Sequence, residues 1–474
     1  DGKVEISYGD QFYDSGFAPE WYDLSSENTR MDLDWTIITE SGHKIKTGFE
    51  HTITDIQVLD IDEPWSGSSG FGVNYDNYNA KTYFGAFYLQ DKISFEGMTL
   101  NVGLRSDYWI PGRYVESAIN DTSNIIITDE ARELFKKETF NFPWAGEPFK
   151  MKARISPRFG ISHPVSDNDV LYFYYGHFSQ LPTFQYVYAK INSKAQSTYQ
   201  VFGNPNLNPK TTVQYEIGVK HRFSEDQVFE LKAYWKDMFD YETSQTIKPS
   251  NPKYANLSFN MYFNADYARS RGIEAILKSR ILANWYLDLN LNYSIITGKS
   301  SSPLDNLLVQ AGQLSEKPLG ESYMSWDRPF HFFTNLSYSN PKNWGASARI
   351  EYESGRRYTR SIQDTIIFVN EKAYYDGPRE DNNPFANISK TAKKNIDVKL
   401  YKTVDWDRYK IKGYIEIENL MNKQVPRRVN PFTGDGYEPG ETYGYYLVNS
   451  PHPNQDPSRY NKPRSMEVGF QFIF

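Results

Sequence analysis

Residues 285–293 read Trp285-Tyr286-Leu287-Asp288-Leu289-Asn290-Leu291-Asn292-Tyr293, an unbroken alternation of apolar or aromatic residues with mostly polar ones. Successive side chains of an extended chain point to opposite faces, so this alternation predicts a strand with one apolar and one polar face. The same period recurs in the ranges 31–37, 229–236, 396–401 and 411–418. Strands of this kind suit a sheet that has an apolar environment on one face and a polar environment on the other.

The period continues along almost the whole chain, and helical periodicity is nearly absent. We expect about 16 strands of roughly 9–13 residues, the length that a tilted strand needs to cross a bilayer. Their expected starts are residues 3, 29, 43, 80, 97, 151, 168, 211, 227, 266, 283, 328, 343, 393, 408 and 464.

The connections between these strands show a second pattern, in which short turns alternate with long segments. The expected turns are Glu40–Gly42, Glu96–Gly97, Ser166–Asp169, Ser224–Asp226, Ser339–Asn343 and Asp405–Asp407. The expected long segments are 11–28, 57–78, 111–148, 180–210, 242–265, 298–327, 358–392 and 421–463. Short periplasmic turns and long extracellular loops are typical of outer-membrane barrels. The sequence therefore predicts an all-β fold, an antiparallel transmembrane β-barrel spanning the outer membrane of a Gram-negative bacterium several times.

Composition agrees with a barrel surrounded by outer-membrane lipids. Aromatic residues make up 16% of the 474 residues, while the mean hydropathy is polar at -0.66. A thin wall with aromatic girdles accommodates both values. The absence of Cys excludes disulfides and thiolate metal sites, and the net charge of -7 argues mildly against a nucleic-acid partner. The last strand carries an alternating apolar face that ends on Phe474, similar to the terminal signal of bacterial barrel proteins.

Three motifs carry a resemblance to a known family. The first is Gly203-Asn204-Pro205-Asn206-Leu207-Asn208-Pro209-Lys210 with the strand containing Tyr215-Glu216-Ile217-Gly218. The second is Ser270-Arg271-Gly272-Ile273-Glu274, and the third is Glu418-Asn419-Leu420-Met421-Asn422-Lys423. In this order they resemble signatures of TonB-dependent outer-membrane receptors, although Lys210 stands where that family frequently has Glu.

The resemblance implies a 22-stranded barrel with an N-terminal plug domain that TonB pulls to admit a scarce ligand. Neither a plug nor a TonB box is recognisable in this chain. We therefore expect residues 1–474 to form strands 7–22 of the family barrel, with the plug outside this chain. The expected partners are outer-membrane lipids, TonB acting through the plug, a surface lipoprotein if one exists, and the imported ligand. That ligand could be a metal chelate, cofactor, glycan or peptide.

Candidate ligand contacts must lie in the loops and at the upper strand ends. Aromatic and Arg side chains suit stacking and charge-assisted hydrogen bonds to such ligands. The same residues also suit an upper aromatic girdle or ordinary loop packing. The candidates are Tyr108, Trp109, Arg113, Tyr114, Arg356, Arg357, Tyr358, Tyr437, Tyr443 and Tyr445, with Tyr446 beside them.

The sequence gives little support for catalysis or for metal or cofactor binding. We identify no catalytic residue, metal ligand set or cofactor motif, so an enzyme is not expected. The main alternative is a complete 16-stranded passive porin, in which the 111–148 loop would fold inward as a constriction. Residues Thr128–Lys137 of this loop could form a short helix, which would be surface decoration in a transporter. A weaker third class is an adhesion or scaffold barrel.

Overall fold

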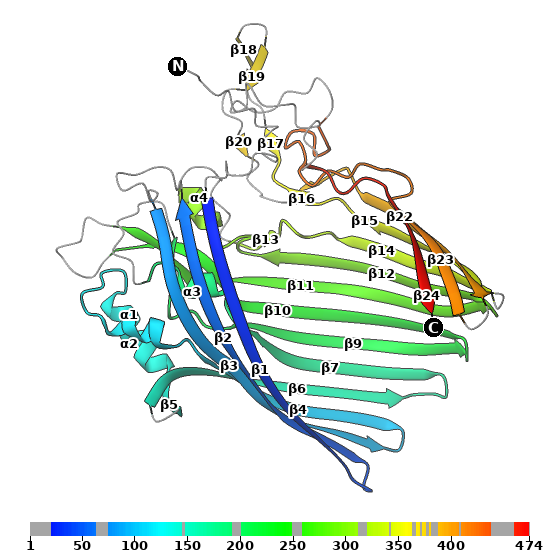
Figure 1. The fold of residues 1–474 in the computed structure, drawn as a ribbon, viewed down its shortest axis with the longest axis horizontal. Helices are drawn as coiled ribbons and strands as arrows, with labels where there is room; N and C mark the ends of the chain where they lie inside the picture. The colour runs from blue at the N-terminus through cyan, green and yellow to red at the C-terminus, as the bar shows by residue number, and fades with distance from the viewer. Residues whose placement is uncertain are drawn as a thin grey trace.

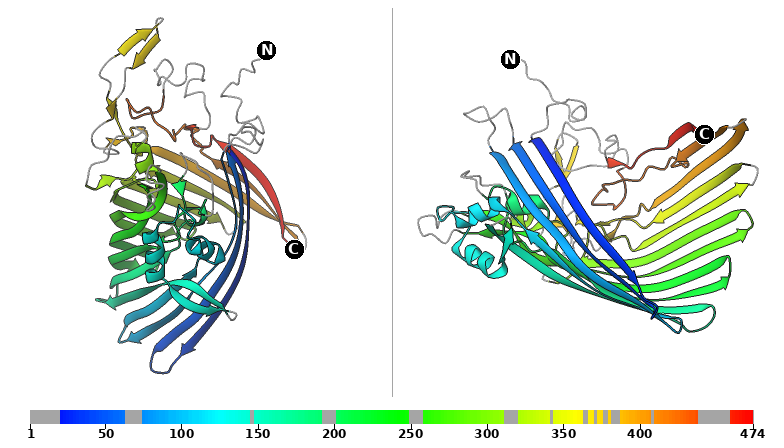
Figure 2. Two further views of the ribbon diagram at one scale, coloured as in Figure 1. Left: turned by 90° about the vertical axis from the view of Figure 1, so that its left-hand side faces the viewer. Right: turned by 60° about the horizontal axis from the view of Figure 1, so that its bottom comes forward.

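The computed structural model describes residues 20–62, 74–144, 147–191, 201–248, 258–310, 320–340, 343–362, 366–369, 372–375, 379–380, 387–406, 409–437 and 459–473. Within these ranges, fifteen long strands form one continuous sheet, and each strand pairs antiparallel with the next (Figure 1). The sheet curves around a hollow (Figure 2). The predicted antiparallel all-β fold is confirmed.

The strands follow chain order without a crossover, because each hairpin places successive strands side by side. Their bounds are β1 (Glu20–Ile38), β2 (His43–Asp62), β3 (Asn74–Phe95), β4 (Met98–Ile110), β6 (Glu147–Pro164), β7 (Asp169–Gln180), β9 (Lys210–Ser224), β10 (Gln227–Ile247), β11 (Phe259–Leu282), β12 (Trp285–Gly298), β14 (Phe330–Asn340), β15 (Trp344–Glu353), β22 (Lys393–Trp406), β23 (Tyr409–Glu418) and β24 (Ser465–Ile473).

Shorter elements lie in the long connections. The helices are α1 (Arg113–Asn120), α2 (Asp129–Glu138), α3 (Phe184–Tyr188) and α4 (Asp305–Gln310). The short strands are β5 (Phe140–Trp144), β8 (Val201–Phe202), β13 (Ser322–Tyr323), β16 (Arg357–Tyr358), β17 (Ser361–Ile362), β18 (Ile366–Val369), β19 (Lys372–Tyr375), β20 (Arg379–Glu380) and β21 (Asn387–Ile388). No helix in the described ranges has the length and apolar character needed to cross a membrane.

The predicted strands from residue 29 onward are all present, and the strand expected from residue 3 lies outside the described residues. Short turns collect at one end of the sheet and long connections at the other, as predicted (Figure 1). We call the end with the long connections the upper end. Several strands extend further at this end than expected: β1 begins at Glu20, β3 at Asn74 and β11 at Phe259.

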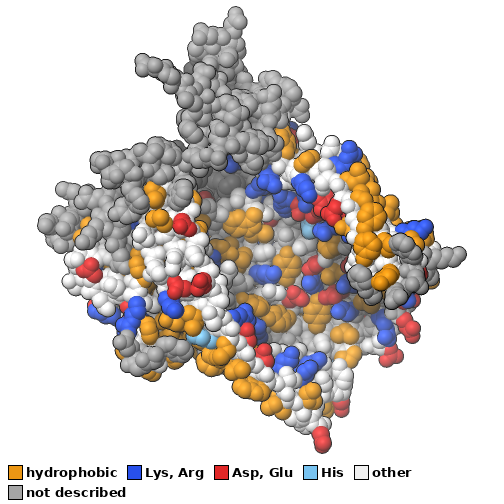
Figure 3. Space-filling view, in the orientation of Figure 1, with side chains coloured by type: hydrophobic (Ala, Val, Ile, Leu, Met, Phe, Trp, Pro, Cys, Tyr) orange, Lys and Arg blue, Asp and Glu red, His pale blue; other side chains and the backbone are white. Residues whose placement is uncertain are grey.

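The two faces of the sheet differ as the alternation predicted. The outer face carries large apolar side chains that remain exposed, such as Leu33, Trp35, Ile217, Val468 and Phe470. The inner face carries charged and polar side chains, which are mixed over the hollowed side of the sheet (Figure 3). An exposed apolar band of this kind suits the hydrocarbon of a bilayer.

Tyrosines of the inner face lie over glycines of the neighbouring strand. Tyr172 lies directly opposite Gly218, and a Cβ at Gly218 would come 2.4 Å from the Tyr172 ring. The Tyr172 hydroxyl passes over the glycine and donates to Glu230, one strand further, at 2.7 Å. Glycine therefore leaves room for a ring that connects three strands across the wall. The same arrangement occurs at Gly48 with Tyr88, Gly272 with Tyr234, Gly345 with Tyr401 and Gly469 with Tyr414.

The sheet has two edges in the described residues, because no pairing joins β1 to β24. β1 pairs with β2, and β24 pairs with β23, each on one side only. β1 is long at 19 residues, and Met31, Leu33, Trp35 and Ile37 on its outer face are exposed. Unpaired backbone N–H and C=O groups are costly in hydrocarbon, where water cannot satisfy them.

Gly272 offers a test of the tyrosine-over-glycine packing. A Cβ at this position would lie 2.6 Å from the Tyr293 carbonyl oxygen and 2.7 Å from the Tyr234 hydroxyl. We expect Gly272→Ala to destabilise the folded protein by about 1–3 kcal/mol, because backbone or ring must shift. The measurement is the urea midpoint of unfolding in lipid vesicles. Gly160→Ala is the matched control, since its nearest contact would be an ordinary 3.6 Å; equal midpoints for both variants would contradict the interpretation.

Candidate functional site

The inner wall of β1–β4 and β6 carries a set of paired charges. Arg105 donates to both carboxylate oxygens of Glu50, at 3.2 and 2.8 Å, and its Nε donates to Asp107 at 2.7 Å. Ala86, fully buried, lies between Glu50 and Asp107 in register, so a small side chain separates the two acids. A bidentate guanidinium–carboxylate pair fixes orientation as well as charge.

Two cavities lie against this wall. The upper one has a volume of about 330 Å³ and is lined by Arg30, Glu50, Arg105, Trp109 and Arg154 among others. The lower one has a volume of about 620 Å³ and adds Asp34, Tyr88 and Arg158. Their linings combine both signs of charge with aromatic rings, a chemistry that suits a polar ligand or another polar protein surface.

A cluster of helices covers the upper inner wall. Phe135 of α2, Val115 and Ile119 of α1, and Tyr188 of α3 are buried in one core with Trp109 of β4. We call the described residues 111–138, 181–191 and 201–209 the loop module. The predicted helix within 128–137 is confirmed as α2, whose first turn is capped by the Thr128 side chain accepting from the Ala131 N–H at 3.2 Å. α2 packs by Phe135 against the inner wall rather than decorating the surface.

A buried carboxylate at the top of β3 helps to hold this module through hydrogen bonds. The Asp76 carboxylate accepts two hydrogen bonds from the backbone N–H of Lys190, at 3.1 and 3.2 Å. Asp76 lies near the upper start of β3, above Phe87 and Leu89, which are large exposed apolar residues of this strand. Burial raises the pKa of Asp76 to about 6 despite these bonds, so desolvation has the larger effect.

The first family motif forms the lower border of the loop module. Gly203 approaches the α3 backbone so closely that a Cβ would lie 2.6 Å from the Val187 carbonyl oxygen. The Asn204 side chain donates to the Tyr262 carbonyl at 2.7 Å, and its Oδ1 accepts from the Asn206 N–H at 2.8 Å. Leu207 is buried in the core of the module. Pro205 and Pro209 lack an N–H to satisfy within this loop.

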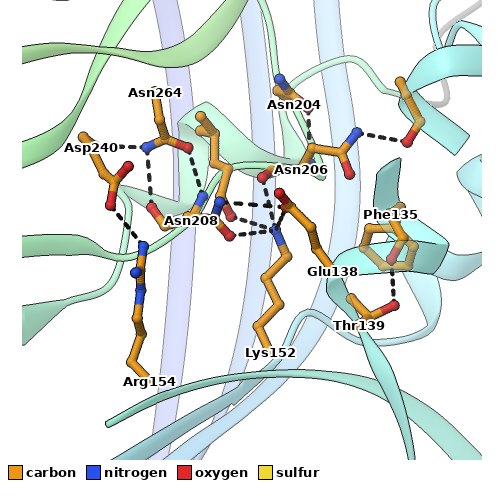
Figure 4. Close-up of polar contacts among 12 residues, drawn as sticks. Phe135, Glu138, Thr139, Lys152, Arg154, Asn204, Asn206, Asn208, Asp240 and Asn264 are labelled. Atoms are coloured by element: carbon orange, nitrogen blue, oxygen red, sulfur yellow. Dashed lines mark hydrogen bonds and ion pairs between the residues drawn. The ribbon is translucent and has the colours of Figure 1, made fainter. Parts of the chain in front are cut away.

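Lys152 of β6 connects this loop to the wall (Figure 4). Its ammonium donates to the carbonyl oxygens of Asn206 and Leu207, at 2.8 and 2.9 Å, and to Asn208 Oδ1 at 3.2 Å. The side chain is only 4% exposed, and the Glu138 carboxylate lies 3.8 Å away. Beside it, Arg154 bonds Asp240 at 2.7 Å. Lys152 thus satisfies two backbone carbonyls that would otherwise be buried without a donor.

A second assembly lies at the upper end of β14, β15 and β22. Arg357 Nε donates to the fully buried Asp327 at 2.7 Å, and its guanidinium lies 3.7 Å from the Tyr323 ring centroid. Asp327 also accepts from the Ile296 N–H at 3.0 Å. These contacts hold the start of the β15–β22 connection to the wall.

One group of potential metal ligands occurs in the described residues, namely His331, Glu351 and Glu353. Lys393 lies 2.9 Å from Glu351, and Arg328 pairs with Glu353. Two cations therefore already balance the two carboxylates. A divalent ion would add charge to a neutral group, so the group fits a charge-balanced wall better than a metal site.

The first candidate ligand contacts predicted from the sequence, in β4 and α1, lie on both faces of the sheet. Trp109 points inward, is 1% exposed and donates to Thr82 at 2.9 Å. Tyr108 points outward and its hydroxyl lies 2.6 Å from His51 Nδ1. The Arg113 guanidinium lies 4.6 Å from the centre of the Phe149 ring, and Tyr114 packs against the core of the loop module.

The later candidates are joined by contacts between loops. Arg356 donates to the Arg427 carbonyl at 2.7 Å. The Tyr358 ring covers Gly434, whose φ of +74° and absent Cβ both require glycine there. The Tyr437 ring lies 5.6 Å from the Arg459 guanidinium. Tyr443, Tyr445 and Tyr446 lie outside the described residues.

The remaining motif residues have structural contacts. Tyr215 packs on Tyr175 on the outer face at 5.1 Å, whereas Glu216 accepts from Gln214 at 3.3 Å. Arg271 lies 5.4 Å from the Trp235 ring centroid, and Glu274 pairs with Lys232 at 3.0 Å.

At the end of β23 the third motif makes a turn. Asn419 has a φ of +50° and its N–H donates to Asp397 at 2.9 Å. The Leu420 N–H donates to the Ile396 carbonyl at 2.8 Å. Phe474 lies outside the described residues.

Sequence reasoning missed Lys152, Glu50, Arg105 and Asp327. A Lys or Arg at an inward strand position is common in any barrel wall, so its type alone does not identify a contact. The partners of Lys152 lie 54 and 55 residues away along the chain, and only the fold brings them together.

Comparison with known proteins assigns this architecture. Residues 3–450 match the family described as TonB dependent receptor-like, beta-barrel. No curated protein sequence matches the chain. Similar solved structures include the outer membrane transporter YddB from Escherichia coli, with 12% identity, a TM-score of 0.56, and coverage of 96% of this chain and 54% of that one.

Two further structures have the same fold. Pseudomonas aeruginosa FpvA bound to heterologous pyoverdines has 11% identity, a TM-score of 0.54, and coverage of 96% of this chain and 49% of FpvA. The ferric yersiniabactin uptake receptor FyuA from Yersinia pestis has 11% identity, a TM-score of 0.53, and coverage of 96% and 55%. This chain therefore spans about half the length of the structures it matches.

The contacts of Lys152 predict a measurable loss of order in the loop module. We expect Lys152→Ala to lower the hydrogen-exchange protection of residues 201–209 about tenfold or more, because two buried carbonyls lose their donor. Exchange followed by mass spectrometry measures this. Lys81→Ala, at an exposed position of β3, is the control and should leave protection unchanged. Unaltered protection in Lys152→Ala would show that the loop holds its place without the ammonium.

Proposed function

Because the chain belongs to the TonB dependent receptor-like β-barrel family, we propose that it forms the wall of an outer-membrane transporter that imports a scarce ligand in an energised step. The single observation that carries this proposal is the family match over residues 3–450. The structure supports it by a loop module that folds onto the inner wall, where it can contact a ligand or a plug.

The two open edges of the sheet support a larger barrel. A long edge strand such as β1 in hydrocarbon leaves a row of backbone groups without partners, so we propose that further strands pair with β1 and β24. The fifteen described strands, with one more expected from residue 3, would then be strands 7–22 of a 22-stranded barrel. A plug domain, separate from these strands, would fill the hollow.

This architecture predicts the size of the mature protein. We expect the intact mass of the protein purified from outer membranes to exceed 55.1 kDa by about a plug and six strands. Mass spectrometry measures it directly. A mass close to 55.1 kDa would contradict the proposed 22-stranded barrel and favour closure by these strands alone.

The candidate ligand contacts take different roles in this proposal. Arg356, Tyr358 and Tyr437 lie in the upper connections, where they could meet a ligand. Tyr443 and Tyr445, outside the described residues, stay candidates on the ground of the sequence alone. Arg357 and Trp109 are buried, so they would position neighbouring groups. Tyr108 and Arg113 pack with the outward cluster around Phe149 and would lie at the membrane interface; Tyr114 would hold the loop module.

The remaining partners follow from the same proposal. The apolar outer band would contact lipids of the outer membrane in a Gram-negative bacterium, and TonB would act through the plug. A surface lipoprotein could cover the upper loops. The ligand could be a metal chelate, cofactor, glycan or peptide. The matched structures are described as transporters and receptors, which supports a transport role without catalysis for this chain.

Uptake experiments distinguish energised import from a passive porin. We expect cells that contain the protein to deplete at least one compound of the medium that a deletion strain leaves behind. The depletion should be lost in cells that lack TonB, because only TonB transmits energy to the plug. Mass spectrometry of the spent medium measures both comparisons.

The controls for this experiment are compounds that enter through general porins, whose depletion should be the same in all strains. Depletion that persists without TonB would support the passive porin. Identical spent media from wild-type and deletion strains would contradict a role in uptake.

A further inference from the structure

Charge is distributed unevenly between the last strands and the rest of the chain. The described residues 387–406, 409–437 and 459–473 contain 13 Lys or Arg and 6 Asp or Glu, a local excess of +7, whereas the whole chain has a net charge of -7. Charges within about 10 Å interact strongly at ordinary salt, while distant ones are screened. The upper end of β22–β24 therefore has a positive potential of its own.

Five cations of this region surround one pocket. The pocket has a volume of about 380 Å³ and is lined by Lys393, Lys394, Lys423, Arg427 and Lys462, with Asn419 and Asn461 between them. We call these five cations the basic mouth. Its carboxylates are Asp397 and Glu418, so cations outnumber acids by five to two.

The two carboxylates are already engaged. Asp397 accepts hydrogen bonds from the Asn395 side chain at 2.8 Å and from the Asn419 N–H at 2.9 Å. Glu418 pairs with Lys462 at 2.7 Å, and Lys393 pairs with Glu351 at 2.9 Å. In the described part of the chain, no carboxylate lies within ion-pair distance of Lys423, Arg427 or Lys394. Lys394 shares the outer face with Ile396 and lies 5.9 Å from the Tyr352 ring centroid. The exposed side chains of Lys423 and Arg427 therefore have charge available for an outside anion.

The pocket opens to the inner side of the sheet. Lys393, Asn395 and Asp397 occupy the inward positions of β22, because Ile396, Val398 and Leu400 between them pair with the outer residues Ile350, Ala348 and Ala346 of β15. The Arg427 guanidinium donates to Asn461 Oδ1 at 3.2 Å, and the Arg427 backbone carbonyl accepts from Arg356 at 2.7 Å. The guanidinium is thus held near the pocket by neighbouring loops rather than swinging freely.

We propose that the basic mouth binds a soluble ligand that carries phosphate or carboxylate groups, as the first contact of the cargo with the barrel. This rests on the proposed import function only in calling the ligand cargo. Ammonium and guanidinium groups around a confined pocket match several anionic oxygens at once. An anionic lipid headgroup has the same chemistry, but the inward position of Lys393 and Asn395 favours a ligand from the hollow.

Binding of tripolyphosphate, a small soluble polyanion, tests the proposal. Isothermal titration calorimetry is performed on the full-length protein in zwitterionic-lipid nanodiscs at low salt. We expect saturable binding that weakens as salt is added. The double variant Lys423→Gln/Arg427→Gln should weaken it about tenfold or more, equivalent to about 1.4 kcal/mol. Arg427→Lys, which keeps the charge, should retain most of the affinity.

The matched control is Lys44→Gln/Lys92→Gln. These two lysines lie opposite each other near the short turns of β2 and β3, and both are exposed. The change in net charge is the same, so only a local effect separates the variants. We expect the control to bind tripolyphosphate within about twofold of the unaltered protein. Equal losses in both variants would overturn the proposal, because the effect would then be one of total charge.

Two other results would also overturn it. The first is absence of tripolyphosphate binding in protein whose uptake in cells remains TonB-dependent, which would leave the import function intact and exclude the anionic ligand class. The second arises in nanodiscs that contain an anionic lipid. If the double variant lost affinity for that lipid and kept its affinity for tripolyphosphate, the basic mouth would be a headgroup site.

Discussion

The constraint on which the structure depends is that a backbone in hydrocarbon must satisfy its hydrogen bonds within the protein. Antiparallel pairing from β1 to β24 does this for fourteen consecutive strand pairs. Once the pairing is fixed, alternation decides which side chains meet lipid and which meet the hollow. In the described residues β1 and β24 each pair on one side only, and the same constraint is the physical reason for proposing further strands at these two edges.

A wall one residue thick cannot build a core of its own, so binding surfaces must come from elsewhere. Here the loop module supplies a core, in which Phe135 and Tyr188 surround Trp109. Lys152 then fixes the family motif to the wall through two backbone carbonyls. The buried ammonium replaces the hydration of these carbonyls and adds to the bond between Asn204 and Tyr262 that also positions the loop. Tyrosines over glycines, such as Tyr172 over Gly218, stiffen the wall that carries this assembly.

The sequence predicted the membrane-crossing part of the fold well and its upper end poorly, for one physical reason. Lipid imposes strict alternation, which located β2 from His43 and β10 from Gln227 at their first residues. Above the lipid, outward positions can be polar, and the period weakens although pairing continues; β11 therefore begins seven residues before the expected start at 266. Contacts such as Lys152 with Asn206 depend on loop closure over 54 residues, which no local pattern encodes.

The net charge of the whole chain differs in the same way from the local charge around one pocket. A net charge of -7 for the chain argues against the binding of anions. The electrostatic potential at a surface, however, depends on the charges within about one Debye length. Around the pocket of β22 and β23, Lys423 and Arg427 have no acid within ion-pair distance in the described residues, whereas Arg105 on another part of the wall bonds both Glu50 and Asp107. Charges are paired on the part of the wall around Arg105, and cations are in excess around the pocket of β22 and β23. The hollow is therefore polar, with a positive potential at one side of its upper end. A ligand that carries anionic groups would therefore be drawn to that side before it meets the balanced charges deeper in the wall.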